Sequence, residues 1–244
     1  MSFGAAMYPL RHDLYEFPSL RENLYEGLIQ IGGEINFDSI LVAYSQGIFP
    51  WFSQDDPVMW FCPLPRLLLF PEQLKISKSL RSFLKHNSWS YSIDKDFSAV
   101  MLQCKQIKRK GQRGSWIHGP IQEVFFELHE KGLAHSIEIW DTDQNLIGGL
   151  YGLAIGHMFC GESMFSKLNN ASKVALKILC DLLIQKGFRF IDCQQDTPHM
   201  RSMGGQCAEL SEFQSLLLEN SKVPIRAQSW FQEETLLYPM PSTL

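Results

Sequence analysis

The chain has 244 residues, of which 45% are hydrophobic and 20% charged, and its formal net charge is −4. This composition supports one large domain or a small domain joined to a larger one, and it excludes a protein that binds polyanions over its whole surface. The six cysteines form no CxxC pair, and neither they nor the seven histidines have metal-ligand spacing. We therefore expect reduced thiols and no metal site.

The first twenty residues, MSFGAAMYPLRHDLYEFPSL, lack the basic start and the apolar segment of a signal peptide. The longest weakly polar stretch, LIGGLYGLAIG, is too short and too rich in glycine to cross a bilayer. We therefore expect a soluble, cytoplasmic protein that does not use a membrane.

Residues 1–66 are rich in proline, glycine and aromatic residues. One helix is predicted in FDSILVAYSQG, and Gly47 is expected to end it. The next stretch, GIFPWFSQDDPVMWFCPLPR, contains too many prolines for a helix or a central strand. We expect it to form a rigid aromatic loop that closes a small N-terminal domain.

From residue 67 to residue 244 the pattern is more regular, and three helices are predicted first. Ser77 is expected to cap KSLRSFLKH, and an aspartate at position 94 or 96 is expected to open a helix that runs to Ile107. The third helix, PIQEVFFELHEKG, is expected to begin at Pro120 and to end at Gly132.

A hairpin follows, in which AHSIEIW and LIGGLYGLAIG are joined by the polar turn DTDQN. A third strand, HMFCGESMF, precedes the amphipathic helix NASKVALKILCDLLIQKG, and FRFIDCQ is the last predicted strand. The order hairpin, strand, helix, strand predicts an α+β domain with one right-handed crossover, in which the last two strands are neighbours.

Polar side chains interrupt these last two strands. Glu162 lies in the apolar run GHMFCGESMFS, and Asp192 and Gln194 lie in RFIDCQQD. Side chains two positions apart on a strand share a face, so Asp192 and Gln194 are expected to point the same way. A carboxylate among apolar side chains is costly unless it has partners. The three residues are therefore either satisfied buried groups or a shared polar site with perturbed protonation.

The segment KQIKRKGQR, residues 105–113, carries five positive charges in an acidic chain. Such a run is usually a solvated helix end, but its isolation also indicates contact with a phosphate backbone. Trp116 follows it, and an aromatic ring beside phosphate-binding residues can stack on single-stranded nucleotides. The basic residues concerned are Lys105, Lys108, Arg109, Lys110 and Arg113.

Several of these segments occur together in one family. AYSQGIFPWFS, FCGESMFS and IDCQ, with GLIQIGGEI, GSWI, LHEKGLAHSIEIW and NASKVAL, stand in the order found in leucyl/phenylalanyl-tRNA–protein transferases. The chain resembles that family from about residue 23 to residue 220. The resemblance implies a small N-terminal domain, residues 1–66, and a C-terminal domain, residues 67–244, with a fold similar to GCN5-related acetyltransferases (GNAT).

The resemblance also implies an activity. Members move Leu, Phe or Met from aminoacyl-tRNA to the N-terminal Arg or Lys of a protein, which marks that protein for degradation by the N-degron (N-end rule) pathway. We expect a monomer that needs no cofactor, because the aminoacyl ester is already activated.

By the same resemblance, Asp192, Gln194 and Glu162 are the catalytic residues. The acceptor amine, with a pKa of about 8, must be neutral to attack the ester carbonyl. Asp192 is expected to bind this amine and assist proton removal, and Gln194 to position it or to relay that effect. Trp51, Trp116 and Phe125 match aromatic residues around the terminal adenosine. The amino-acid pocket is expected to consist of Leu150, Phe159, Leu179 and Ile191.

The chain also departs from the family pattern. CPLPR replaces SPDPR, so that Cys62 and Leu64 stand in place of small polar and acidic residues, and TPH at residues 197–199 replaces Asn-x-His. AEL at residues 208–210 stands where Ile-Pro-Arg is expected. These differences leave the three catalytic positions unchanged.

Two other functions remain possible from the sequence. An acyl-CoA-dependent acetyltransferase of the same fold would have a glycine-rich turn where this chain has FSKLNNASKVA, although a helix N-terminus alone can hold an anion. A non-catalytic RNA-binding module would explain the basic run but not the buried aspartate and glutamine.

Overall fold

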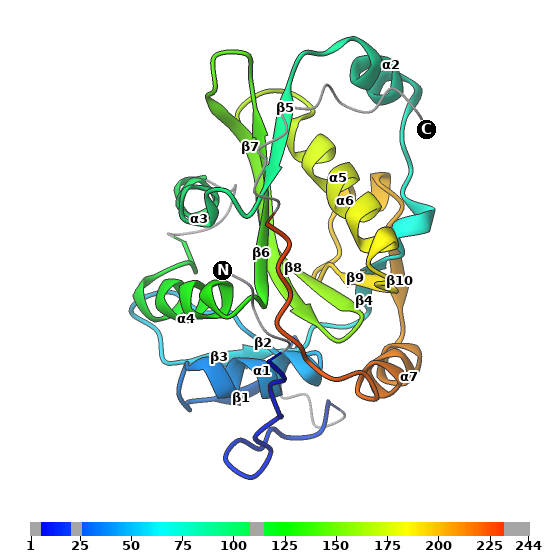
Figure 1. Cartoon of the computed structure of the whole chain (residues 1–244). Helices are drawn as coiled ribbons and strands as arrows, with labels where there is room; N and C mark the ends of the chain where they lie inside the picture. The colour runs from blue at the N-terminus through cyan, green and yellow to red at the C-terminus, as the bar shows by residue number, and fades with distance from the viewer. Residues whose placement is uncertain (1–5, 21–25, 108–114, 232–244) are drawn as a thin grey trace.

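The computed structural model describes residues 6–20, 26–107 and 115–231. These residues form a three-stranded sheet of order β1-β3-β2 and a seven-stranded sheet of order β10-β4-β9-β8-β7-β6-β5. Helices cover both faces of the large sheet, with α3 and α4 on one side and α5 on the other (Figure 1). The predicted α+β class is confirmed. Among the described helices, none combines the length and hydrophobicity needed to cross a bilayer.

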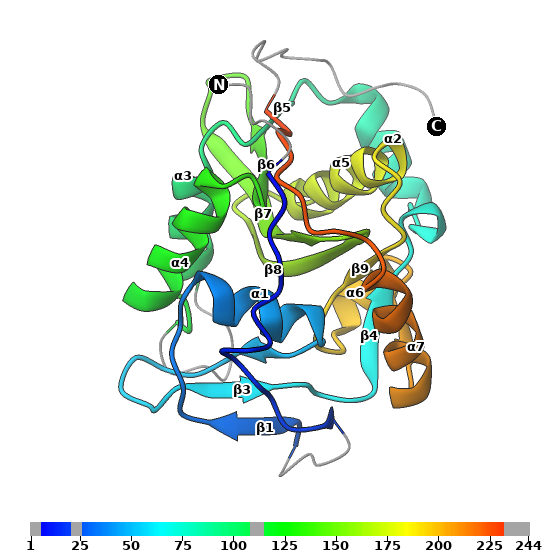
Figure 2. The ribbon, with the colours of Figure 1, turned by 60° about the horizontal axis from the view of Figure 1, so that its bottom comes forward.

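The small sheet and α1 lie at one end of the large sheet (Figure 2). Helix α1 is confirmed where it was predicted: Asn36 and Ser39 form a capping box at its start, and Gly47, with φ of 75°, follows its end. The elements of this part are β1 (Leu28–Ile31), α1 (Phe37–Ser45), β2 (Phe49–Pro50) and β3 (Met59–Phe61).

The expectation of a loop without a central strand in residues 47–66 is wrong. Strand β3 lies between β1 and β2 in the small sheet. Its three residues contain no proline, because the prolines at positions 57 and 63 fall on either side of it. Pro50 lies in the edge strand β2, where a missing backbone donor is tolerated.

The large sheet is antiparallel except for one pair. Strands β8 and β9 run parallel, with Cys160 opposite Asp192, and α5 connects them. This confirms that the two strands with polar interruptions are neighbours. The strands are β4 (Arg66–Leu69), β5 (Ser90–Ile93), β6 (Ala134–Trp140), β7 (Leu146–Ile155), β8 (Met158–Ser166), β9 (Phe190–Asp192) and β10 (Gln206–Ala208).

The four helices predicted in this part are also confirmed. Ser77 caps α2, and of the two candidate aspartates it is Asp96 that caps α3. The predicted helices are α2 (Lys78–His86), α3 (Phe97–Gln106), α4 (Gly119–Glu130) and α5 (Ala171–Gln185). The sequence analysis did not predict β1, β4, β5, β10, the 3-10 helix η2 (Pro71–Gln73), α6 (Pro198–Ser202) or α7 (Leu210–Asn220).

The core has two parts, one on each face of the large sheet. One part packs around α1, α3 and α4, and the other lies between the sheet and α5. The small sheet ends at Phe61, and the large sheet begins at Arg66. Residues 6–8 pair with residues 225–227, since the Tyr8 N–H donates to the Ile225 oxygen and the Ala227 N–H donates to the Ala6 oxygen. The domain boundary after residue 66 stays a prediction.

Candidate active site

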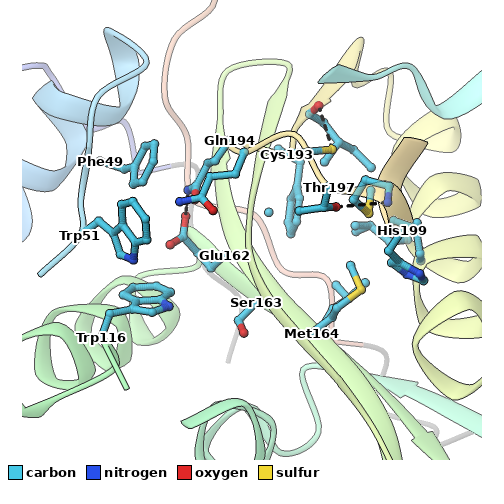
Figure 3. Close-up of a pocket in the computed structure, with 18 of the residues that line it drawn as sticks. Phe49, Trp51, Trp116, Glu162, Ser163, Met164, Cys193, Gln194, Thr197 and His199 are labelled. Atoms are coloured by element: carbon cyan, nitrogen blue, oxygen red, sulfur yellow. Dashed lines mark hydrogen bonds between the residues drawn. The ribbon is translucent and has the colours of Figure 1, made fainter. Parts of the chain in front are cut away.

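A cavity of about 450 Å³ opens where β8 and β9 separate. The two strands pair as far as Cys160 and Asp192, after which β9 ends while β8 continues to Ser166. The chain then turns toward α6, which leaves a space beside β8. Figure 3 shows side chains around this space, and the labelled ones come from β2 and Trp51 after it, from Trp116 before α4, from β8, from the segment after β9 and from α6.

Glu162 owes its orientation to a β-bulge. Tyr151 pairs with Ser163 and Gly152 pairs with Gly161, so Glu162 is the extra residue of β8. A bulge re-aims a side chain that strict alternation would place elsewhere, and bulges are frequent beside active sites. The sequence analysis missed it, although single glycines inside both strands were an available signal.

Gln194 is hydrogen-bonded directly to Glu162. Its Nε2 donates a hydrogen bond of 2.9 Å to Glu162 Oε1, as the dashed line in Figure 3 marks. Strand β9 has already ended, and Gln194 adopts a left-handed backbone with φ of 62°. A glutamine in this conformation is uncommon and is held by its surroundings. The expectation that Asp192 and Gln194 share one strand face is therefore wrong.

Asp192 lies behind the cavity wall rather than in it. Its side chain accepts hydrogen bonds of 2.7 Å from Arg66 Nε at Oδ1 and from Arg66 Nη2 at Oδ2, and the residue is 1% exposed. Oδ1 also accepts the backbone N–H of Gln194 at 2.9 Å. This differs from the expectation that Asp192 itself binds the amine, because both oxygens are occupied and neither reaches the cavity.

The Glu162 carboxyl is strongly perturbed. Burial raises its pKa to about 8, and the nearby Asp192 charge acts in the same direction, while the Tyr44 hydroxyl and the Gln194 amide lower it. The group is therefore largely protonated at neutral pH and can both donate and accept hydrogen bonds. Burial in turn raises the pKa of the Tyr44 hydroxyl well above its usual value.

Aromatic side chains form one wall of the cavity. Phe49, Trp51 and Trp116 lie together on one side of the Glu162–Gln194 pair (Figure 3). Trp51 is 36% exposed, so a ligand can reach its ring from solvent. Phe125 does not belong to this wall, contrary to expectation. It is fully buried on α4 and packs against Tyr151, with ring centroids 5.6 Å apart.

The four residues expected to form an apolar pocket all line the cavity. Leu150, Phe159, Leu179 and Ile191 come from three strands and α5. Gly152 makes room for this wall, because a Cβ there would approach the Phe159 ring to 2.5 Å. The cavity is also lined by residues that were not expected at the site from the sequence, namely Phe49, Pro50, Gly161, Ser163, Met164, Leu176, Cys193, Gln195, Thr197, His199 and Met200.

The basic segment is described only at its first residue. Lys105, on α3, donates a hydrogen bond of 2.8 Å from Nζ to Gln122 Oε1 and lies outside the cavity lining. Its predicted contact with RNA stays a prediction. Lys108, Arg109, Lys110 and Arg113 lie outside the described residues.

The thiols near the site are not activated as nucleophiles. The six cysteines are free thiols, and burial raises the pKa of both Cys160 and Cys193 well above the usual value. Neither is thus activated as a thiolate nucleophile. Within the described ranges, no three His, Cys, Asp or Glu side chains are grouped to hold a metal ion.

Comparisons with known proteins agree along most of the chain. A family profile described as leucyl/phenylalanyl-tRNA protein transferase matches residues 68–218, and the profile of that family's N-terminal domain matches residues 33–64. A protein named leucyl/phenylalanyl-tRNA–protein transferase from Shewanella sediminis is 44% identical over 93% of this chain and 97% of its own length. A protein of the same name from Flavobacterium johnsoniae is 44% identical over 86% of this chain and 99% of its own length.

Two solved structures are more distant. A GCN5-related N-acetyltransferase from Kribbella flavida is 10% identical with a TM-score of 0.37, over 69% of this chain and 59% of that chain. L-PGS from Bacillus licheniformis is 7% identical with a TM-score of 0.36, over 79% of this chain and 65% of that chain. Likenesses of this size add no argument about fold or chemistry.

Proposed function

We propose, because the chain belongs to the leucyl/phenylalanyl-tRNA–protein transferase family, that it moves an amino acid from aminoacyl-tRNA to the N-terminal amine of a protein. The donors would be Leu-tRNA, Phe-tRNA and Met-tRNA, and the acceptors would be proteins that begin with Arg or Lys. The product would enter the N-degron pathway in the cytoplasm. These finer assignments come from the family resemblance.

The observation that carries the proposal is the position of the Glu162–Gln194 pair. It lies in one cavity with the aromatic wall of Phe49, Trp51 and Trp116 and with the apolar residues around Leu179. An aminoacyl-adenosine has the same three parts in the same order: a flat base, an ester and an apolar side chain. The base would stack on the tryptophans, the ester would lie beside the polar pair, and the side chain would fill the apolar region.

The chemistry needs a neutral amine and a place for its proton. The acceptor nitrogen forms a bond to the ester carbonyl carbon, the bond from that carbon to the ribose oxygen breaks, and the ribose oxygen gains the proton that the amine loses. No acyl-enzyme is required. Because the pKa of Glu162 is about 8, close to that of an N-terminal amine at about 8, proton exchange between them is nearly balanced.

Gln194 and Asp192 then have separate tasks. Gln194 donates a hydrogen bond to Glu162 through Nε2. The side-chain oxygen of Gln194 would then accept a hydrogen bond from the attacking amine. Asp192 holds the Gln194 backbone from behind and does not contact the substrate. The amino-acid side chain would be selected by shape, because Ile and Val branch at Cβ and would meet the cavity wall.

One assay tests the proposal. The protein is incubated with Leu-tRNA and a peptide that begins with Arg, without ATP or CoA, and the peptide mass is measured. The expected product is longer by one leucine. Matched controls use the same peptide with an acetylated N-terminus, and free leucine with uncharged tRNA. Failure to lengthen the free-amine peptide, or equal product from the acetylated one, would contradict the function.

A further inference from the structure

Arg66 is the first residue of β4, and its side chain is buried beside the candidate site. The residue is 1% exposed, and a buried guanidinium is costly unless its donors are paired. The guanidinium donates four hydrogen bonds: two to Asp192, one of 3.0 Å from Nη2 to the backbone oxygen of Gly47, and one of 4.0 Å from Nη1 to Cys62 Sγ. The Cζ atom also lies 5.0 Å from the ring centroids of both Phe49 and Phe213.

These contacts lead to both halves of the cavity. Through Asp192, Arg66 reaches the backbone N–H of Gln194, whose side chain bonds Glu162. Through Gly47 and the Phe49 ring, it reaches the segment that carries Phe49 and Trp51 into the aromatic wall. Glu162 lies on β8 of the large sheet, and Phe49 lies on β2 of the small sheet. One guanidinium therefore joins two parts of the molecule at the point where both must meet a single substrate.

Stability alone does not account for this ion pair. Apolar residues of similar volume often replace a buried ion pair without loss of stability. What apolar residues cannot reproduce is direction, since the planar guanidinium fixes both oxygens of a carboxylate in one plane. Asp192 held in this way presents Oδ1 to the Gln194 backbone, which is in the left-handed conformation.

We propose that Arg66 is a positioning residue that aligns the Gln194 amide with the aromatic wall at residues 49–51, so that the ester is held at the polar pair when the base is stacked. This inference rests on the proposed transfer activity. Arg66 does not contact the substrate and acts only through Asp192, Gly47 and Phe49.

The test separates alignment from stability with the double variant Arg66→Met/Asp192→Leu, which replaces the buried pair with apolar side chains. The measurements are Tm, and kcat and KM for transfer from Leu-tRNA to the Arg-peptide. We expect Tm to stay within a few degrees of the unmodified protein and kcat to fall about 10²-fold, the loss typical of a small misplacement of reacting groups. A double variant with both the Tm and the kcat of the unmodified protein would overturn the proposal.

A matched control is available in the exposed pair Arg11–Asp13, which joins the same residue types in the same two-bond geometry and lies outside the cavity lining. The double variant Arg11→Met/Asp13→Leu should leave kcat unchanged, and a comparable loss in both double variants would count against alignment by Arg66.

If the Arg66 double variant does not fold, Arg66→Lys decides the question. Lysine keeps the cation next to Asp192 but loses the planar fork and the bond to Gly47. We expect kcat at least about tenfold below that of the unmodified protein, at a temperature where both are folded. Unchanged kcat would overturn the inference. An inactive unmodified protein would instead contradict the proposed function, so the two failures are distinguishable.

Discussion

Two buried carboxyl groups of the large sheet differ in what surrounds them. Glu162 on β8 and Glu138 on β6 both interrupt apolar strands, and burial raises the pKa of both. Glu138 accepts hydrogen bonds from the hydroxyls of Ser92 and Ser136 and from the backbone N–H of Lys95. Glu162 accepts one from the Gln194 amide, interacts with the Tyr44 hydroxyl, and lines the cavity.

Access from a cavity separates a buried polar group from a reaction site. The hydrogen-bonding capacity of Glu138 is filled by its own sheet, and the residue is 0% exposed and outside the cavity lining. Glu162 keeps capacity for a ligand because the bulge in β8 turns it toward an open space. A raised pKa is common to both, so access by a substrate distinguishes them.

The largest effects are expected from substitutions of the polar residues at the cavity, compared with the same kind of substitution at Glu138. Gln194→Ala should lower kcat/KM for transfer by about 10²–10³-fold, as the loss of a preorganised hydrogen-bonding group at a reacting centre does. Glu162→Gln should lower it by about 10²-fold or more if Glu162 exchanges the proton. Glu138→Gln is the matched control, and it should leave kcat/KM within a few fold of the unmodified protein. Equal losses at Glu138 and Glu162 would contradict the comparison.

The pH dependence of stability provides a second test. The pKa of Glu162 is about 8 in the folded protein, whereas an unperturbed glutamate has a pKa of 4.5. The folded state therefore binds this proton more tightly than the unfolded state does. The resulting stability is complete below about pH 4.5 and is lost as the pH rises through 8, by an amount on the order of a few kcal/mol. Glu162→Gln should therefore flatten the fall in the free energy of unfolding between pH 5 and 8.

Urea denaturation at several pH values measures this slope. Glu138→Gln should flatten it as well, because the same sign applies to a carboxyl whose pKa burial raises. Only the Glu162 variant should combine the flatter slope with loss of transfer. A slope that both variants leave unchanged would show that neither carboxyl is protonated in the folded state.

Selection of the amino acid tests the apolar region of the cavity. Leu179→Phe should disfavour transfer of Phe more than of Leu, because the added ring occupies space that the larger substrate needs, by about 1–3 kcal/mol in relative kcat/KM. Competition between Phe-tRNA and Leu-tRNA for one Arg-peptide measures the ratio. Leu182→Phe, on the same helix but outside the cavity lining, should leave the ratio unchanged. If Leu179→Phe reduced transfer of Leu more than transfer of Phe, Leu179 would lie outside the pocket. Equal use of Ile-tRNA and Leu-tRNA by the unmodified protein would contradict the pocket assignment as a whole.

A similar pair of tryptophans extends the comparison to binding. Trp116 lines the cavity, whereas Trp140 donates a hydrogen bond of 2.9 Å from its ring to Ser92 Oγ beside Glu138. Trp116→Ala should weaken binding of Leu-tRNA by about 1–3 kcal/mol, the value of one base stacked on an aromatic ring. Trp140→Ala should leave binding unchanged at a temperature where the variant is folded. Unchanged binding in the Trp116 variant would remove Trp116 from the adenosine site.

Features that depend on neighbouring residues could be predicted from the sequence. Ser77 and Asp96 cap helices within three residues, and the apolar periodicity of residues 171–185 specifies one face of α5. The order of elements also placed β8 beside β9. Caps and periodicity act over a few residues, so they can be read along the chain without knowledge of the fold.

The arrangement of the site residues depends on contacts between distant parts of the chain. Arg66 and Asp192 are 126 positions apart, and no local rule pairs them. The bulge at Glu162 and the left-handed backbone of Gln194 follow from strand pairing and from hydrogen bonds to distant groups. Glu138 and Glu162 are both buried acidic residues in strands of the same sheet, and their positions in the sequence do not show which one borders a cavity. Only the packing of β8, β9 and α6 leaves a cavity beside one of them, since such a space depends on contacts between segments that are remote in the chain.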